Sequence, residues 1–177
     1  MATSVAPFYE GWRLANRELM RALGPLTREQ LALPIREAWP MWASASHVAA
    51  ARIYWLCHVF GEPGADATPF ADPDQGWEDD LAHPRSADEL VGALASTWRI
   101  VEHALETWTP ESLTHTARRA RGDEVRIHTR QSVVWRLITH DAFHTGEISL
   151  TLGEHGLGTG SPNGAVDLWS GLSRAER

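Results

Sequence analysis

Four stretches of the chain repeat apolar residues at helical spacing, and this periodicity limits the fold more than any other feature. They span about residues 7–23, 42–60, 86–108 and 129–156. Glycine and proline follow the first two stretches, as is typical where helices end. At 177 residues the chain fits one domain with a core made without disulfides or a structural metal. The sequence therefore predicts an all-α four-helix bundle that forms a single domain over residues 1–177.

The connections between these stretches differ in length. Residues 61–85 are rich in Pro, Gly and Asp, and a loop this long is more typical of a crossover or a functional cover than of a simple turn. Ser86 and Glu89 form a capping-box pattern that begins the third helix. Residues 27–30 carry a similar pattern and predict a short helical connector between the first two helices.

A small β-hairpin is predicted between the third and fourth helices. Leu113 to Arg118 and Val125 to Thr129 alternate apolar and polar residues on either side of the turn signal at residues 121–123. After the fourth helix, residues 158–177 read as a loop-like tail. Its apolar residues, which include Trp169, predict that this tail docks on the bundle.

Charge and cysteine content limit the partners. The net charge is -7, and the lone basic run, residues 118–121, is followed by Asp123 and Glu124, so we interpret it as a solvated turn. We therefore expect no nucleic-acid partner and no membrane partner. No stretch approaches the roughly 18 apolar residues of a membrane span. The single cysteine, Cys57, excludes an internal disulfide, and we expect a cytoplasmic location.

Two histidines lie four residues apart in the fourth helix. His140 and His144 share a face with Val133 and Leu137, so they point toward the bundle interior. A divalent metal ion can bind two imidazoles at this spacing, but core histidines hydrogen-bonded to backbone or carboxylate are an equal alternative. A zincin protease would need a glutamate directly after the first histidine. Asp141 stands there, so we do not expect a metalloprotease.

His47 is the strongest candidate for a third ligand. It lies early in the second helix among small residues, where a neighbouring helix could approach closely. His58 follows on nearly the same stripe, but roughly 16 Å further along the helix, too far to bind the same ion. We interpret the remaining histidines as surface or structural residues: His83, His103, His115, His128 and His155.

These residues carry a family resemblance. The segment from Trp42 to Ala50, with His47 inside it, and the later segment from Ser132 to Ile148, with His-x-x-x-His-x-Gly-Glu, resemble the DinB/YfiT-like metalloenzyme superfamily over nearly the whole chain. The resemblance implies a bundle with up-down-down-up connectivity, for which residues 61–85 supply the crossover. It also implies a divalent ion, zinc or nickel, held by His47, His140 and His144 with open positions for water or substrate. Some members place a carboxylate where His140 stands.

The resemblance also implies a class of reaction. Characterised members resemble thiol-dependent transferases and isomerases that use mycothiol or bacillithiol. We therefore expect a metal-dependent thiol S-transferase or isomerase-type enzyme, with a small-molecule electrophile and a thiol as partners and a homodimer as its assembly. One alternative is a non-catalytic metal- or ligand-binding bundle associated with stress. A second is a metal-dependent hydrolase.

Three further residues near the histidines have expected roles. Glu147 follows His144 by one turn on the same face, so it could accept a proton or orient a ligand imidazole, or instead pair with an arginine. Asp141 points about 100° away from His140 and is expected to be structural. Cys57 lies mid-helix without an activating partner, so we do not expect it to act as a nucleophile.

Overall fold

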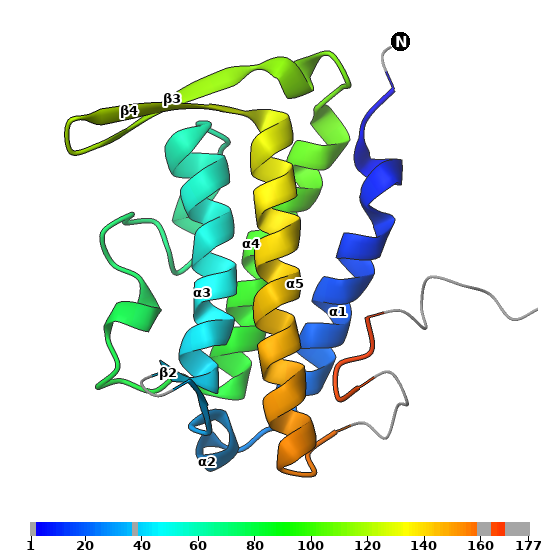
Figure 1. Cartoon of the computed structure of the whole chain (residues 1–177), viewed down its shortest axis with the longest axis vertical. Coiled ribbons are helices and arrows are strands. Elements are labelled where there is room, and N and C mark those ends of the chain that lie inside the picture. Colours follow the sequence, from blue (N-terminus) through cyan, green and yellow to red (C-terminus); the bar gives the residue numbers. More distant parts are fainter. Residues whose placement is uncertain (1–2, 37–38, 159–163, 169–177) are drawn as a thin grey trace, which may run out of the picture.

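The computed structural model describes residues 3–36, 39–158 and 164–168. Within these ranges the chain forms five α-helices and two small antiparallel sheets, which confirms the mainly helical fold. The helices are α1 (Glu10–Leu23), α2 (Arg28–Leu31), α3 (Met41–Ile53), α4 (Ala87–Thr107) and α5 (Arg130–Glu154). Figure 1 shows the four long helices, α1, α3, α4 and α5, side by side, with α2 at one end. No helix in the described ranges is both long and apolar enough to cross a membrane.

The two predicted capping boxes, at Thr27 and Ser86, are present in the structure, and a third one at Thr129 was not predicted. Ser86 precedes α4, where its backbone N–H donates to the Glu89 carboxylate at 2.8 Å and its hydroxyl accepts from the Glu89 N–H. Thr27 caps α2 with Gln30 in the same way, and Thr129 caps α5. These bonds satisfy backbone donors that have no partner within the first helical turn. Local sequence therefore sets these three helix starts.

The second predicted helix differs from the structure in its last turns. The α-helical part, α3, ends at Ile53, and a π-helical segment, η2 (Tyr54–Val59), continues it. Apolar periodicity does not reveal such a change, because the segment keeps apolar residues buried while its hydrogen-bond spacing widens. In front of α1, residues Ala6–Tyr9 likewise form a 3₁₀ turn (η1) instead of the first α-helical turn.

The β-hairpin is present, but its first strand begins later than predicted. The strands are β3 (Thr116–Arg121) and β4 (Glu124–Thr129), and Gly122 takes a positive φ of 58° in the turn between them. The prediction of a strand from Leu113 was wrong, because Ser112–Thr114 form a 3₁₀ turn (η5). There the Ser112 hydroxyl accepts a hydrogen bond from the Thr109 N–H at 2.9 Å, and such local side-chain bonds compete with strand pairing.

One other prediction about the extended segments needs correction, and one sheet was not predicted. The basic run at residues 118–121 is part of strand β3, not a solvated turn. The second small sheet, β1 (Pro34–Arg36) with β2 (Trp39–Pro40), was not predicted, because its strands are too short to show an alternating pattern. It leads the chain from α2 into α3.

The segment at residues 61–85 connects the end of η2 to α4 and contains two short 3₁₀ turns, η3 (Ala65–Ala67) and η4 (Trp77–Asp79). Phe70 is buried, and the Arg85 guanidinium lies 4.5 Å from the centre of the Trp77 ring. In Figure 1 this segment runs beside α3. It therefore packs on the helices over part of its length.

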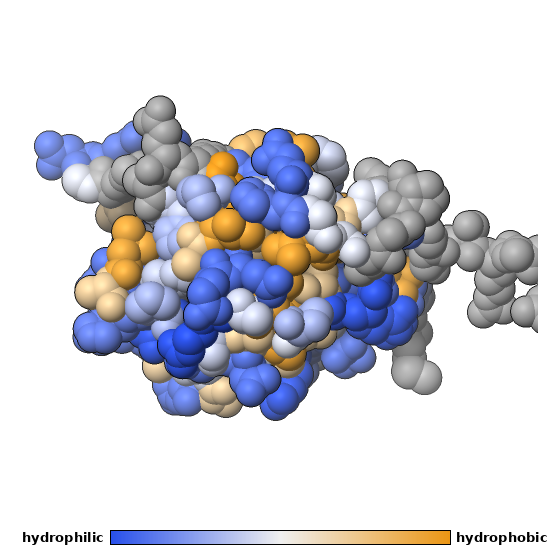
Figure 2. Space-filling model, turned by 90° about the horizontal axis from the view of Figure 1, so that it is seen from below, coloured by the Kyte–Doolittle hydropathy of each residue, from blue (hydrophilic) through white to orange (hydrophobic). Residues whose placement is uncertain are grey.

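The predicted tail, residues 158–177, falls mostly outside the described residues, which here are 158 and 164–168. Ala165 and Val166 are buried, and the Val166 N–H donates to the Ser149 hydroxyl of α5 at 3.0 Å. Trp169 lies outside the described residues. Figure 2 shows the end of the molecule where α2 lies and α5 ends, with mostly hydrophilic residues and small groups of apolar ones between them.

A buried ion pair joins the four long helices. Arg52 of α3, whose side chain is 1% exposed, donates to the Asp141 carboxylate of α5 at 2.7 and 3.0 Å. The same guanidinium donates to the Asn16 side chain of α1 at 2.8 Å and to the Leu94 carbonyl of α4 at 3.4 Å. The Trp12 indole of α1 donates to Asp141 at 2.8 Å. Asp141 is therefore structural, in agreement with the sequence analysis.

We predict that Arg52→Met lowers the free energy of unfolding by about 3–5 kcal/mol, because it leaves the Asp141 carboxylate buried without its cation. Burial would raise the pKa of Asp141, but the Arg52 charge and neighbouring donors outweigh it and hold this pKa below its usual range. The carboxylate therefore stabilises the fold above about pH 4, and this stabilisation is lost as the pH falls through the lowered pKa.

The measurement is equilibrium unfolding in urea with EDTA present, so that metal binding does not contribute. The double variant Arg52→Met with Asp141→Asn removes both charges and should be more stable than Arg52→Met alone. A cost below about 1 kcal/mol for Arg52→Met would contradict this account of the ion pair.

Candidate metal centre

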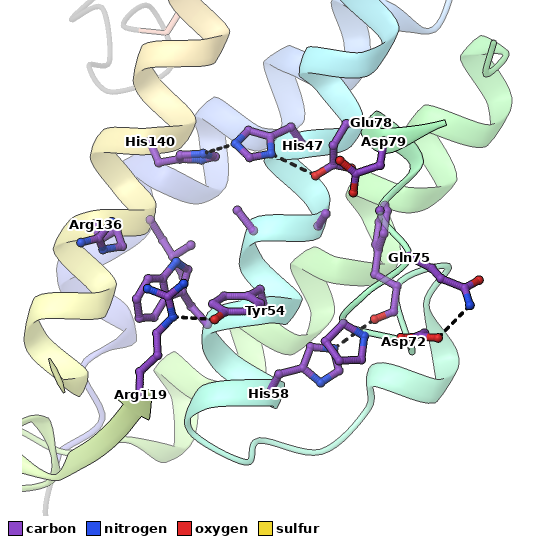
Figure 3. A pocket seen from close by; sticks show the side chains of 17 residues that line it. His47, Tyr54, His58, Asp72, Gln75, Glu78, Asp79, Arg119, Arg136 and His140 are labelled. Carbon is purple, nitrogen blue, oxygen red and sulfur yellow. Dashed lines mark hydrogen bonds and ion pairs between the residues drawn. The ribbon is translucent and has the colours of Figure 1, made fainter. Parts of the chain in front are cut away.

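The three predicted histidines come together between two helices. His47 lies on α3, His140 and His144 lie on α5, and all three are partly buried. One ring nitrogen from each lies within 4.8 Å of those of the other two. The Nε2 atoms of His47 and His140 are 2.9 Å apart, and Figure 3 shows these two rings facing each other. Zinc–nitrogen bonds of about 2.0–2.1 Å hold the nitrogens of one ion within roughly 4 Å of each other, so the three rings need to approach only a little more closely to share one ion.

Carboxylates orient two of the three rings. The Nδ1 of His47 lies 3.0 Å from the Glu78 carboxylate, and the Nδ1 of His144 lies 2.8 Å from the Glu147 carboxylate. Because an ionised carboxylate only accepts, each Nδ1 carries the hydrogen and each Nε2 keeps its lone pair. This is the tautomer that a metal-ligating histidine needs.

His140 is oriented less completely. Its Nδ1 is 3.7 Å from the Asp141 Oδ1, which is too long for a hydrogen bond. Both of these atoms are buried, and neither has a hydrogen-bond partner among the described residues. The short Nε2–Nε2 contact between His47 and His140 needs one ring to donate, whereas a cation between them would accept both lone pairs. The donor set of three imidazoles therefore fits a divalent ion.

The environment of His144 favours its neutral form. Burial lowers the pKa of His144, the nearby His140 and His47 lower it further, and the Glu147 carboxylate partly offsets this by raising it. The net effect is a pKa below the usual histidine range. His144 is therefore neutral near pH 7, as a ligand must be.

Burial raises the pKa of the Cys57 thiol to about 11. The thiolate is the nucleophilic form of cysteine, so Cys57 stays protonated and unreactive near pH 7. This agrees with the expectation that it is not a nucleophile.

A cavity of about 470 Å³ opens beside the histidine cluster. Residues from α3, η2, the 61–85 segment, β3 and α5 line it, and they include His47, Tyr54, Trp55, Phe70, Glu78, Arg119, Arg136 and His140. His58 also lines it, but its Nε2 lies 3.3 Å from the Phe70 carbonyl, and it is not part of the cluster. The site thus pairs a cluster of nitrogen donors with space for a small molecule.

Sequence reasoning missed several residues of this site, among them Glu78, Arg119 and Arg136. Glu78 lies 31 residues after His47 inside the long connection, and no local pattern indicates their contact. Arg119 was placed in the basic run that we interpreted as a solvated turn. Reading that run as a strand would have alternated Arg118 and Arg119 between its two faces and left one of them toward the bundle.

Comparisons with known proteins show a family and a fold. Residues 12–148 match the model of the DinB superfamily. Among solved structures, the chain is similar to the crystal structure of a DinB-like protein from Bacillus cereus ATCC 10987, with 21% sequence identity and a TM-score of 0.64. The match covers 88% of this chain and 95% of that one, and at this identity it shows the fold alone. No curated protein matches the sequence.

We predict that His144 titrates below about pH 6.5 in the metal-free protein, because burial disfavours its charged form. Glu147→Gln should lower this pKa further, because it removes the negative charge that raises it. A ¹H–¹⁵N NMR titration of the histidine rings gives the pKa and the tautomer together. Glu102→Gln on α4 is the control and should leave the His144 titration unchanged, and a raised pKa in Glu147→Gln would contradict the assigned contact.

Proposed function

This chain belongs to the DinB superfamily, and on that premise we propose that His47, His140 and His144 hold a divalent metal ion, zinc or nickel. We propose further that the ion serves a metal-dependent thiol S-transferase or isomerase-type reaction with a low-molecular-weight thiol such as mycothiol or bacillithiol. The observation that carries the proposal is the convergence of three ring nitrogens within 4.8 Å beside a cavity. Family membership favours this reaction class over others that the same donors could serve.

The proposal includes the family's architecture. We interpret α1, α3, α4 and α5 as a bundle with up-down-down-up connectivity in a single domain over residues 1–177. In this arrangement α3 and α4 run in the same direction, and residues 61–85 provide the long connection between them. That connection carries Glu78 to His47.

The residues of the chain have separate tasks in this site. When bound, the ion would supply positive charge that lowers the pKa of a thiol or water in its open position, since three neutral imidazoles do not offset that charge. Glu78 and Glu147 hold the protons on the Nδ1 atoms of His47 and His144, which keeps both Nε2 atoms directed inward. Trp55 and Phe70, both buried, give the cavity apolar walls for an electrophilic substrate.

Two alternatives use the same residues. A metal-dependent hydrolase would use water instead of a thiol in the open position, because the same ligands lower the pKa of a bound water. A non-catalytic bundle would bind an ion or small ligand without turnover. The proposed partners are a small-molecule electrophile, a thiol and a second copy of the chain. We also propose a cytoplasmic location, since the single cysteine is free and buried.

We predict that the purified protein binds one divalent ion per chain and that His47→Ala, His140→Ala and His144→Ala each remove it. Glu78→Ala and Glu147→Ala should weaken binding by about 10–100-fold, because they release the ligand rings without deleting them. Elemental analysis and calorimetric titration with zinc measure both effects. His103→Ala, at an exposed position on α4, is the matched control and should bind as the wild type does. Full metal occupancy in His144→Ala would refute the assigned site.

We predict that turnover needs both the metal and a thiol. The assay combines mycothiol or bacillithiol with a panel of electrophiles and follows the loss of free thiol, with and without a chelator. Activity without any thiol would instead identify the hydrolase. Binding of thiol or electrophile without turnover would identify the non-catalytic alternative.

A further inference from the structure

Two arginines line the cavity beside the histidine cluster and share one aromatic ring. Arg119 comes from β3, and Arg136 comes from α5, one helical turn before His140. Their guanidinium carbons lie 5.4 and 4.8 Å from the centre of the Trp55 ring, and Trp55 is buried. Figure 3 shows Arg119 beside Tyr54, and Arg136 between that pair and His140. The cavity therefore has a cationic region next to its nitrogen-donor region.

No carboxylate of the described residues forms an ion pair with either guanidinium. Other arginines of the same region do pair, as Arg130 does with Glu62 and Arg126 with Glu124. Arg119 donates its Nε hydrogen to the Tyr54 hydroxyl at 2.5 Å, which leaves its terminal nitrogens to face other acceptors. Two uncompensated cations held against one ring repel each other, and an anion placed between them would remove that repulsion.

The pKa of His128 is affected by the same positive charges. The ring centre of His128 lies 4.9 Å from that of Trp55, on the hairpin strand β4. Burial lowers the pKa of His128, and the charges of Arg136, Arg119 and Arg126 lower it further. This end of the cavity is therefore electropositive in a chain whose net charge is -7.

The opposite wall of the cavity carries the other sign. Asp72, Glu78 and Asp79 line it from the 61–85 segment, and Glu78 is already engaged with His47. A negatively charged group is repelled from that wall and attracted to the arginines. The charges of the cavity thus favour one orientation of an elongated anionic substrate, with its negative end at the arginines.

We propose that Arg119 and Arg136 bind an anionic group of the substrate, a carboxylate or a phosphate, while its reacting group lies at the histidine cluster. This inference rests on the proposed function for the location of the reaction. Arg136 precedes His140 by four residues, about 6 Å along α5, and Tyr54 follows His47 by seven, about 10 Å along α3. The expected substrates are therefore acids whose charged group lies roughly 6–10 Å from the reacting atom.

The test compares three thiols of equal chain length on the zinc-loaded protein by isothermal titration calorimetry. The probes are 6-mercaptohexanoate, 6-mercaptohexyl phosphate and the neutral 6-mercaptohexan-1-ol. We expect at least one anionic probe to bind roughly tenfold or more tightly than the alcohol, because arginine hydrogen bonds to an anion are charge-assisted. The anionic probe that binds more tightly shows whether the substrate carries a carboxylate or a phosphate.

Variants of Arg119 and Arg136 test whether these residues cause the tighter binding of the anionic probes. Arg119→Met and Arg136→Met should each reduce it, and the double variant should abolish it without changing the affinity for the alcohol. Arg118→Met is the matched control, since Arg118 is exposed on the same strand and does not line the cavity. Arg136→Lys should retain part of the preference. Equal affinity for all three probes, or a preference that survives the double variant, would overturn the proposal.

The design separates this inference from the proposed function. In His144→Ala, which lacks the zinc site, all affinities should fall, but the anions should still bind more tightly than the alcohol. If the wild type takes up no metal, the proposed function fails, and the same comparison on the metal-free protein still tests the arginines. Circular dichroism checks the fold of each variant. Arg136 is exposed, so Arg136→Met alone decides the outcome if Arg119→Met does not fold.

Discussion

The guanidinium of Arg52 is the point at which the four long helices meet, and the position of the site depends on it. Arg52 binds Asp141 of α5, Asn16 of α1 and the Leu94 carbonyl of α4. Asp141 directly follows His140, and Arg52 follows His47 by five residues. The contact that fixes the register of α3 against α5 therefore also sets His47 opposite His140. Burying this charge costs desolvation, so we expect the ion pair to contribute more to specifying one helix register than to net stability.

Local patterns were enough to locate most helices and the histidine cluster. The capping box at Ser86 acts within one turn, so the sequence alone indicates where α4 begins. The i, i+4 spacing of His140 and His144 follows from helix geometry. The π-helical segment and the start of β3 were not predictable in this way, because hydrogen bonds that periodicity does not encode decide them.

The rest of the site depends on contacts between distant parts of the chain. Glu78 reaches His47 from a connection without regular pattern, and Arg119 reaches the cavity only because the hairpin crosses over η2. Arg52 carried one local signal, since it is the one arginine in an alanine-rich helix whose other buried residues are apolar or serine. Its partner could not be chosen from the sequence, since Asp141 is 89 residues away. The register of one helix against another depends on tertiary packing, so it cannot be derived from a single sequence.

The 61–85 segment has two structural roles, because it lines the cavity and also places the Glu78 carboxylate against His47. A compound that fills the cavity and contacts this segment would steady Glu78, and so would steady one ligand of the proposed ion. By thermodynamic linkage, the ion must then strengthen binding of that compound by the same factor by which the compound strengthens binding of the ion. We therefore expect retention of the proposed ion and occupancy of the cavity to rise and fall together.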